Sequence, residues 1–184
     1  SRLYEPNSVD EVREVLSECS RDAKILGAGS NLLIPDQGID SPVFRLGKGF
    51  RHSKILDQGS ASVLIEVGGA MPLMTLSRSM SELGLSGLEF AGGIPASLGG
   101  AVWMNAGAHG SEMSQIIRSV SVILGDGNVR RFRRDEIKFA YRHSGIPAGA
   151  VIIGAELLLK RGDPETIQAH RAECLAERKK RQPL

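Results

Sequence analysis

The sequence predicts an α+β fold, because segments with strand and helix patterns follow one another without strict alternation. Val120–Leu124 and Val129–Phe132 flank the turn sequence Gly-Asp-Gly-Asn, which is typical of a β-hairpin. Val151–Leu159 has few polar residues, which favours a central strand. A chain of 184 residues fits one domain or two small lobes that share a core. We place the division near residue 47, giving a small lobe of 1–47 and a larger one of 48–184.

The first helix is predicted from Ser8 and Glu11, which have the spacing of a capping box, and from apolar residues at helical spacing that continue to about Ser20. A second helix begins near Leu73 and ends at Gly84. The other strands expected in this half are Lys24–Leu26, Pro42–Leu46 and Val63–Val67.

The second half of the chain contains two short helix candidates, Glu112–Ile117 and Arg134–Ala140. The last helix opens with Asp163 as its N-cap and Pro164 at its first position. Its apolar face is expected to carry Ile167, Ala172 and Leu175.

Composition excludes several classes of protein. The formal charge of +2 is too small to indicate a nucleic-acid partner, and no apolar run approaches the ~20 residues of a membrane span. No His or Cys cluster has metal-ligand spacing, and Cys19 and Cys174 are expected to be free thiols. The basic run Arg130–Arg134 is interpreted as a solvated edge strand. These features favour a globular cytoplasmic protein without a nucleic-acid, membrane or metal partner.

The stretch Gly87–Gly110 contains seven glycines, separated mainly by small and apolar residues. Glycine at this density is tolerated where the backbone turns with positive φ or approaches another surface closely. One interpretation is a backbone cradle for a cofactor with phosphates and ring heteroatoms. The other is a buried turn that serves packing alone, and composition leaves both open.

A second glycine turn, Gly27–Leu33, follows the strand candidate at Lys24. Leu32 stands where the dinucleotide-binding pattern G-x-G-x-x-G needs its third glycine, so that fingerprint is rejected. Gly27, Gly29, Ser30 and Asn31 could still present amides to a pyrophosphate. The residue pattern alone favours an ordinary turn between strands.

The segment Tyr141–Ser144 carries the main candidate for chemistry. Arg142 has a planar cationic fork suited to a carboxylate or an enolate oxygen. The spacing alone favours the alternative, a surface arginine paired with Asp135 or Glu136. Tyr141 could equally be a substrate contact or a buried ring with its hydroxyl satisfied, and the small residues around His109 favour a structural histidine.

Three segments together resemble the UDP-N-acetylenolpyruvoylglucosamine reductases: L-G-A-G-S-N-L-L at 26–33, the whole glycine stretch at 87–110, and F-A-Y-R-H-S at 139–144. The resemblance implies a vanillyl-alcohol-oxidase (PCMH-type) fold in which two α+β lobes hold non-covalent FAD. It also implies that NADPH reduces the flavin, which passes hydride to the enolpyruvyl group of UDP-N-acetylglucosamine enolpyruvate in peptidoglycan synthesis.

The resemblance assigns roles to individual positions. Arg142 matches the catalytic arginine that stabilises the enol, and Tyr141, Arg142 and His109 are expected to contact substrate. The residues expected to bind FAD are Gly27, Ala28, Gly29, Ser30, Asn31, Leu32, Gly93, Ile94, Pro95, Ser97, Gly99, Gly100, Ala101 and Ile153.

The sequence also departs from the family pattern. His109 stands where tyrosine is common, Ala28 replaces a glycine, and Ala96 replaces another. The family continues into a substrate-binding domain with a catalytic serine and glutamate, so we expect this chain to be an FAD-binding part that does not complete the reaction alone. A non-catalytic flavin-binding module and another oxidoreductase on the same fold are the alternatives.

Overall fold

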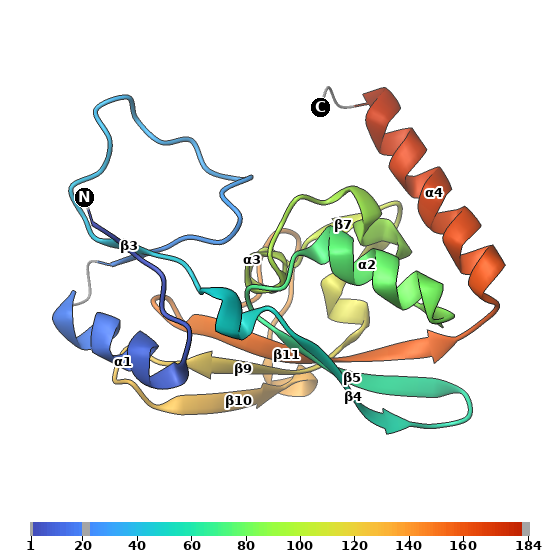
Figure 1. Cartoon of the computed structure of the whole chain (residues 1–184), viewed down its shortest axis with the longest axis horizontal. Coiled ribbons are helices and arrows are strands. Elements are labelled where there is room, and N and C mark those ends of the chain that lie inside the picture. The colour runs from blue at the N-terminus through green and yellow to red at the C-terminus, as the bar shows by residue number, and fades with distance from the viewer. Residues whose placement is uncertain (1, 20–22, 182–184) are drawn as a thin grey trace.

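The computed structural model describes residues 2–19 and 23–181, and its centre is an antiparallel sheet (Figure 1). The main path runs β10-β9-β11-β5-β4. A short strand, β6, pairs with the end of β11. The bounds are Ser53–Gln58 for β4, Ser62–Gly68 for β5, Leu85–Ser86 for β6, Ile117–Ile123 for β9, Val129–Arg133 for β10 and Val151–Arg161 for β11.

The predicted central strand is confirmed, because β11 pairs with β9 on one side and β5 on the other. Ala155 lies opposite both Val67 and Val120, and Leu157 and Leu159 are completely buried. The predicted hairpin is confirmed as β9 and β10, in which Val129 pairs with Ile123.

One face of the sheet is covered by α2 (Leu73–Glu82), α3 (Leu98–Trp103) and the 3₁₀ turn η3 (Glu89–Gly93). Leu73, Leu76 and Met80 of α2 are buried in the main core, as their helical spacing predicts. Leu98 and Val102 of α3 are completely buried in the same core.

A smaller unit precedes this sheet. It contains the parallel strands β1 (Leu3–Tyr4), β2 (Lys24–Ile25) and β3 (Val43–Phe44), in the order β1-β3-β2, together with α1 (Val9–Glu18). Ser8 caps α1 by accepting a hydrogen bond from the Glu11 amide at 3.2 Å. The core of this unit includes Ile123 and Val151 of the large sheet, so the two units share packing. The division at residue 47 stays a prediction.

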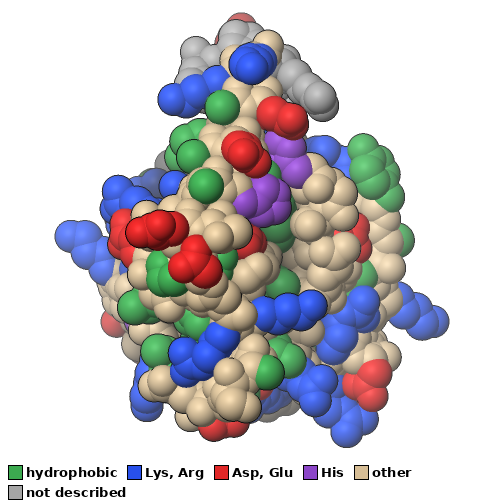
Figure 2. Space-filling model, turned by 90° about the vertical axis from the view of Figure 1, so that its right-hand side faces the viewer, with side chains coloured by type: hydrophobic (Ala, Val, Ile, Leu, Met, Phe, Trp, Pro, Cys, Tyr) green, Lys and Arg blue, Asp and Glu red, His purple; other side chains and the backbone are tan. Residues whose placement is uncertain are grey.

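The last helix, α4 (Pro164–Arg181), packs on η3 and α2 through one stripe and projects from the body. Asp163 caps it by accepting a hydrogen bond from the Thr166 amide at 2.8 Å. Ile167 is buried and Leu175 is half-buried, but Ala172 is exposed, so that part of the expected apolar face is wrong. Figure 2 views the side of the molecule on which α4 stands and shows side chains of both charges along it.

Other elements are short. They are β7 (Gly107–Ala108), β8 (Ser111–Glu112), and the 3₁₀ turns η2 (Lys48–Phe50), η4 (Met113–Gln115) and η5 (Arg134–Glu136). Only η5 forms within the helix candidate 134–140, where an isolated bridge joins Ala140 to His143 instead. The predicted end of the first helix, Ser20, lies outside the described residues.

The edge strand β10 is as expected: Phe132 is buried, while its arginines are exposed. Cys19 and Cys174 are free and buried, and burial raises the pKa of the Cys174 thiol. In the described part of the chain, no helix has the length and apolar content required to cross a membrane. Nor do the described residues contain a group of three or more His, Cys, Asp or Glu side chains that could hold a metal ion.

Burial in β11 gives a stability prediction. Leu157→Ala leaves a cavity in the main core and is expected to lower the free energy of unfolding by about 3 kcal/mol. Leu158 is 41% exposed on the same strand, so Leu158→Ala is the matched control and should cost less than about 1 kcal/mol. Urea unfolding of both variants checks this. Equal losses of unfolding free energy would contradict the burial of Leu157 in the main core.

Candidate cofactor and substrate site

The turn at 27–31 leaves its backbone donors free. Leu26 still donates to Phe44 at 2.8 Å, which continues the pairing of β2 with β3. None of the next five amides, Gly27 to Asn31, donates a hydrogen bond to another described residue. Gly29 has φ of +79°, and nothing lies within 4 Å of the place where its Cβ would stand. Successive free amides in such a turn form a site suited to an anion.

The residues of this turn line a cavity of about 1300 Å³. Ligand pockets usually have about 300–1,000 Å³, so this cavity has room for a dinucleotide. Its wall is formed by the loop after β2, the turn after β5, the segment around α3, and the turn at Tyr141 and Arg142. The cavity therefore lies where the small N-terminal unit meets the main sheet.

Gly27 and Gly99 play a different part from Gly29, which has open space around it. Gly99 donates to Gly69 at 2.8 Å, and a Cβ on Gly99 would lie 3.1 Å from the Ile152 carbonyl oxygen. A Cβ on Gly27 would lie 3.0 Å from the Ser97 hydroxyl oxygen. At Gly27 and Gly99, glycine therefore permits close packing of backbone segments, while the free donors lie on the 27–31 turn.

Positive charge predominates around the cavity. Its lining contains Lys24, Arg45, Arg51, Arg142 and Arg178 but a single acidic residue, Glu112. Arg45 is paired with Glu5, since its Nε donates a hydrogen bond to the Glu5 carboxylate at 2.6 Å. The remaining cations favour an anionic ligand in the cavity, as a diphosphate would be.

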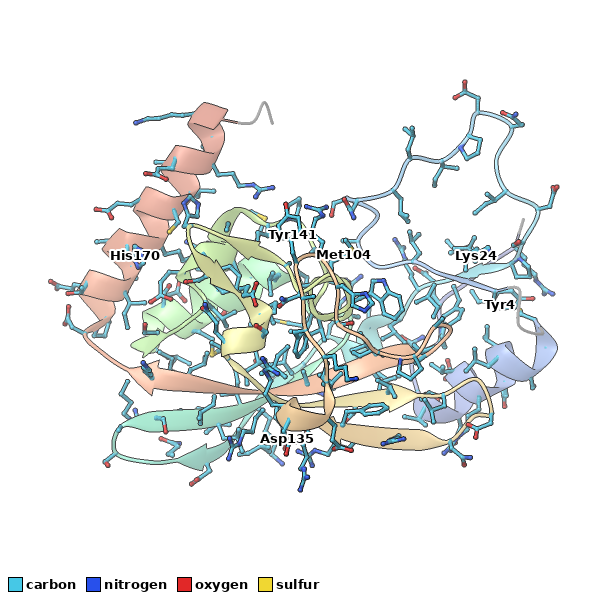
Figure 3. All side chains as sticks on the ribbon, turned by 180° about the vertical axis from the view of Figure 1, so that it is seen from behind. Tyr4, Lys24, Met104, Asp135, Tyr141 and His170 are labelled. Carbon is cyan, nitrogen blue, oxygen red and sulfur yellow. The ribbon has the colours of Figure 1, made fainter. Side chains whose placement is uncertain are left out.

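Arg142 stands at the tip of a tight turn. Its φ is +52°, a left-handed conformation that is uncommon for residues other than glycine and asparagine. The guanidinium Nη2 donates to Asn31 Oδ1 at 3.3 Å. Asp135 pairs with Arg133, and Glu136 pairs with Arg130 and Arg133, so the expected surface pairing of Arg142 with either acid is not formed. Figure 3 shows the neighbouring Tyr141 between α4 and the long loop after β2.

Most of the residues expected to bind cofactor or substrate line this one cavity. They are Gly27, Ala28, Gly29, Ser30, Asn31, Leu32, Ile94, Pro95, Ser97, Gly99, Gly100, Ala101, Tyr141 and Arg142. The structure thus brings together segments more than 100 residues apart.

Three expected residues are absent from the lining of this cavity. Gly93 lies under Arg178, whose Cδ would be 2.5 Å from a Cβ at that position. His109 has φ of +53° and its Nδ1 lies 3.1 Å from the Glu177 carboxylate on α4. Ile153 is half-buried, and its carbonyl accepts a hydrogen bond from Gly69 at 2.7 Å. Contacts of these three with a ligand stay predictions.

Sequence reasoning missed Gly69, Asn105 and Arg178 in the lining. None of the three was named as a candidate site residue, and Gly69 and Arg178 lie outside the segments that carry the resemblance. Arg178 reaches the cavity because Gly93 has no side chain in its way. The signal for Arg178 was the glycine pair Gly92 and Gly93, which packs against the side of α4 that carries Arg178.

The carboxylate of Glu112 gives a pH prediction. A hydrogen bond from Ser114 lowers its pKa most, and Asn105 and Arg134 lower it further against the effect of desolvation. A depressed pKa in the folded state stabilises the protein above the unfolded pKa, and this stabilisation is lost as pH falls through the folded value. Glu112→Gln should therefore destabilise the chain at pH ~7, with a smaller difference from the parent chain below pH ~4. Urea midpoints at both pH values measure this, and an equal difference at both would contradict it.

Residues 1–133 match the family model described as "FAD binding domain". The reductase of Heliobacterium modesticaldum named UDP-N-acetylenolpyruvoylglucosamine reductase is 45% identical over 161 residues, covering 87% of this chain and 50% of the relative. The protein of the same name from Bacillus subtilis is 39% identical over 186 residues, covering 98% of this chain and 60% of the relative. The chain thus spans about half to three fifths of these relatives.

Solved structures agree. The crystal structure of UDP-N-acetylenolpyruvylglucosamine reductase from Thermus caldophilus superposes with a TM-score of 0.85 at 35% identity, covering 99% of this chain and 64% of that one. A solvent-stable cholesterol oxidase superposes with a TM-score of 0.61 at 16% identity over 86% of this chain, which shows the fold alone. The expected α+β, PCMH-type fold is confirmed, and FAD is the cofactor by which the matching family is described. The chain belongs to the FAD binding domain family.

Proposed function

We propose that the chain is the FAD-binding part of a UDP-N-acetylenolpyruvoylglucosamine reductase. The whole enzyme would use NADPH to convert UDP-N-acetylglucosamine enolpyruvate to UDP-N-acetylmuramate in the cytoplasm. The observation that carries this proposal is Arg142, whose guanidinium lies 3.3 Å from Asn31 at a cavity lined by free amides. Identity of 35–45% to relatives of that name supports the same substrate.

The residues present fit FAD. The amides from Gly27 to Asn31 would hold the diphosphate, whose charge matches the cations around the cavity. The apolar wall near Ile94, Pro95 and Ile152 would face the ring system and exclude water from it. When bound, FAD supplies hydride transfer from the nicotinamide cofactor to the enolpyruvyl double bond.

Arg142 would act on charge that develops during the reaction. Hydride addition to the terminal carbon of the enolpyruvyl double bond builds negative charge next to the carboxylate, whose oxygens take it up as an enolate, and a fixed cation beside them lowers the barrier. The role of Arg142 would be to stabilise this charge as a cation, and the proton would come from another group. Tyr141, 89% exposed beside it, and His109 would contact the substrate. The protonation step would belong to the part of the enzyme outside this chain.

The two alternatives predict a different site. A module that only carries flavin needs the anion-binding turn but gives no reason for an arginine in a strained conformation at the cavity. Another oxidoreductase on the same fold would not share 45% identity over most of the chain with a reductase of this name.

The proposal is tested with the full-length enzyme under anaerobic conditions. NADPH should bleach the blue absorbance of the bound flavin, and UDP-N-acetylglucosamine enolpyruvate should restore it with formation of UDP-N-acetylmuramate. Reoxidation that does not depend on the enolpyruvyl sugar nucleotide would contradict the substrate. A purified chain that binds no flavin would contradict the proposal as a whole.

A further inference from the structure

The turn that carries Arg142 is fixed by hydrogen bonds at its base. The Ala140 amide donates to His143 at 2.9 Å, and the His143 amide donates back to Ala140 at 3.1 Å. Tyr141 and Arg142 form the tip, and the positive φ of Arg142 points to a backbone held in place by its surroundings. The position of the guanidinium therefore depends on what anchors this turn.

Asn105 anchors the turn to the main core. This residue follows the end of α3, is 4% exposed, and has φ of +41°, which asparagine tolerates. Its Nδ2 donates to the Ala140 carbonyl at 3.2 Å, and its Oδ1 accepts from the Ser114 amide at 3.0 Å. One buried carboxamide thus joins the glycine-rich stretch, the segment after β8 and the base of the Arg142 turn.

Asn31 holds the other end of the arginine. Its Oδ1 accepts from Arg142 Nη2 at 3.3 Å, between residues 111 positions apart. Asn31 lies on the turn with the free amides, so the cofactor turn and the arginine are in direct contact. The partner is neutral, so it orients the guanidinium and leaves the positive charge available, whereas a carboxylate would neutralise it.

We propose that Asn105 and Asn31 are positioning residues for Arg142: Asn105 fixes the turn that carries it, and Asn31 fixes the direction of its guanidinium. This inference rests on the proposed function, because it assigns Arg142 to the reaction. It adds that the arginine is placed jointly by the α3 segment and by the cofactor turn. Occupancy of the cofactor turn would then favour the orientation of Arg142 that the reaction uses.

A double-mutant cycle in the full-length enzyme tests this. Asn31→Ala and Asn105→Gly, in which glycine keeps the positive φ, are each made alone and combined with Arg142→Ala. Each single asparagine variant should slow flavin reoxidation at saturating enolpyruvyl substrate about tenfold or more, because Asn31→Ala removes a hydrogen bond to a charged group and Asn105→Gly removes two buried hydrogen bonds that anchor the Arg142 turn. In the Arg142→Ala background the same changes should alter that rate less than about twofold, because residues that act through one group are not additive.

Two further readouts separate positioning from general damage. Flavin content and the rate of flavin reduction by NADPH are measured in each asparagine variant, and the loss in the reoxidation rate should exceed any loss in the reduction rate by about fivefold or more, because Arg142 is proposed to act in the enolpyruvyl step. In the flavin-free chain of 184 residues, the NMR signals of the Arg142 Nη2 protons should shift and exchange faster with water in Asn31→Ala, which removes their acceptor Asn31 Oδ1. Asn31→Asp should restore a slowly exchanging signal while reoxidation stays slow, because the carboxylate orients the guanidinium but neutralises it.

The outcomes distinguish this inference from the proposed function. If Arg142→Ala leaves reoxidation unchanged, the proposed role of Arg142 fails and this inference with it. If Arg142→Ala slows reoxidation but the asparagine changes are additive with it, only the positioning roles are overturned. Where Asn105→Gly fails to fold, the cycle and the NMR signal of the Asn31 variants decide, and an unshifted Arg142 signal overturns the inference.

Discussion

Replacing Arg142 with alanine in the full-length enzyme is expected to slow flavin reoxidation by the enolpyruvyl substrate about 100-fold or more, with flavin still bound. Removing one preorganised group that stabilises developing negative charge typically costs roughly 10²–10³ in rate. Stopped-flow measurement of the reoxidation phase, after reduction with NADPH, gives the rate directly. The reduction phase should stay close to that of the parent enzyme.

The matched control is Arg133→Ala, which removes an exposed arginine of β10 that pairs with Asp135. It should leave both phases within about twofold, as surface substitutions away from a site usually do. Arg142→Gly should slow flavin reoxidation as much as Arg142→Ala does. It should unfold at a higher urea concentration than Arg142→Ala, because glycine adopts the φ of +52° without strain. Reoxidation at the parent rate in Arg142→Ala would remove this residue from the mechanism.

Gly29→Val is expected to weaken FAD binding by the isolated chain by about 100-fold or more. The residue lines the cavity with φ of +79°, so a branched side chain both strains the turn and enters the space of the cofactor. Titration of the flavin-free chain with FAD, followed by flavin fluorescence, gives the dissociation constant.

Gly38→Val provides the control for backbone strain. Gly38 has φ of +78° and equally open surroundings on the same long loop, but it is not part of the cavity lining. Its substitution should change the dissociation constant less than about threefold. Equal weakening by both variants would mean that loop conformation, and not contact at the 27–31 turn, governs binding.

Much of the fold could be predicted from the chain because local signals agreed with the tertiary structure. Ser8 with Glu11, Asp163 with Pro164, and the Gly-Asp-Gly-Asn turn each mark an element that the structure contains. Strand β4 was missed because all six of its residues are exposed. Its sequence therefore lacks the alternation of apolar and polar residues that marks a half-buried strand. Helix α3 was missed because Gly99 and Gly100 lower helix propensity, a cost accepted where the helix backbone packs closely on Ile152 and Gly69.

The site was predictable only in part. The cavity segments came from the resemblance, since the residue pattern of Gly27–Asn31 alone favoured an ordinary turn. Which glycines have free space and which serve packing depends on distances between segments, such as Gly27 to Ser97, that no local pattern encodes. The contacts of Asn105 with Ala140 and of Asn31 with Arg142 join positions 35 and 111 residues apart, so they appear only once the chain is folded.

A crystal structure of this chain grown with FAD tests the central claim most directly. We predict density for the diphosphate against the 27–31 turn, with its oxygens within hydrogen-bonding distance of those amides, and for the ring system within the same cavity. Density for FAD elsewhere, or a cavity closed by protein groups bonded to those amides, would contradict the account.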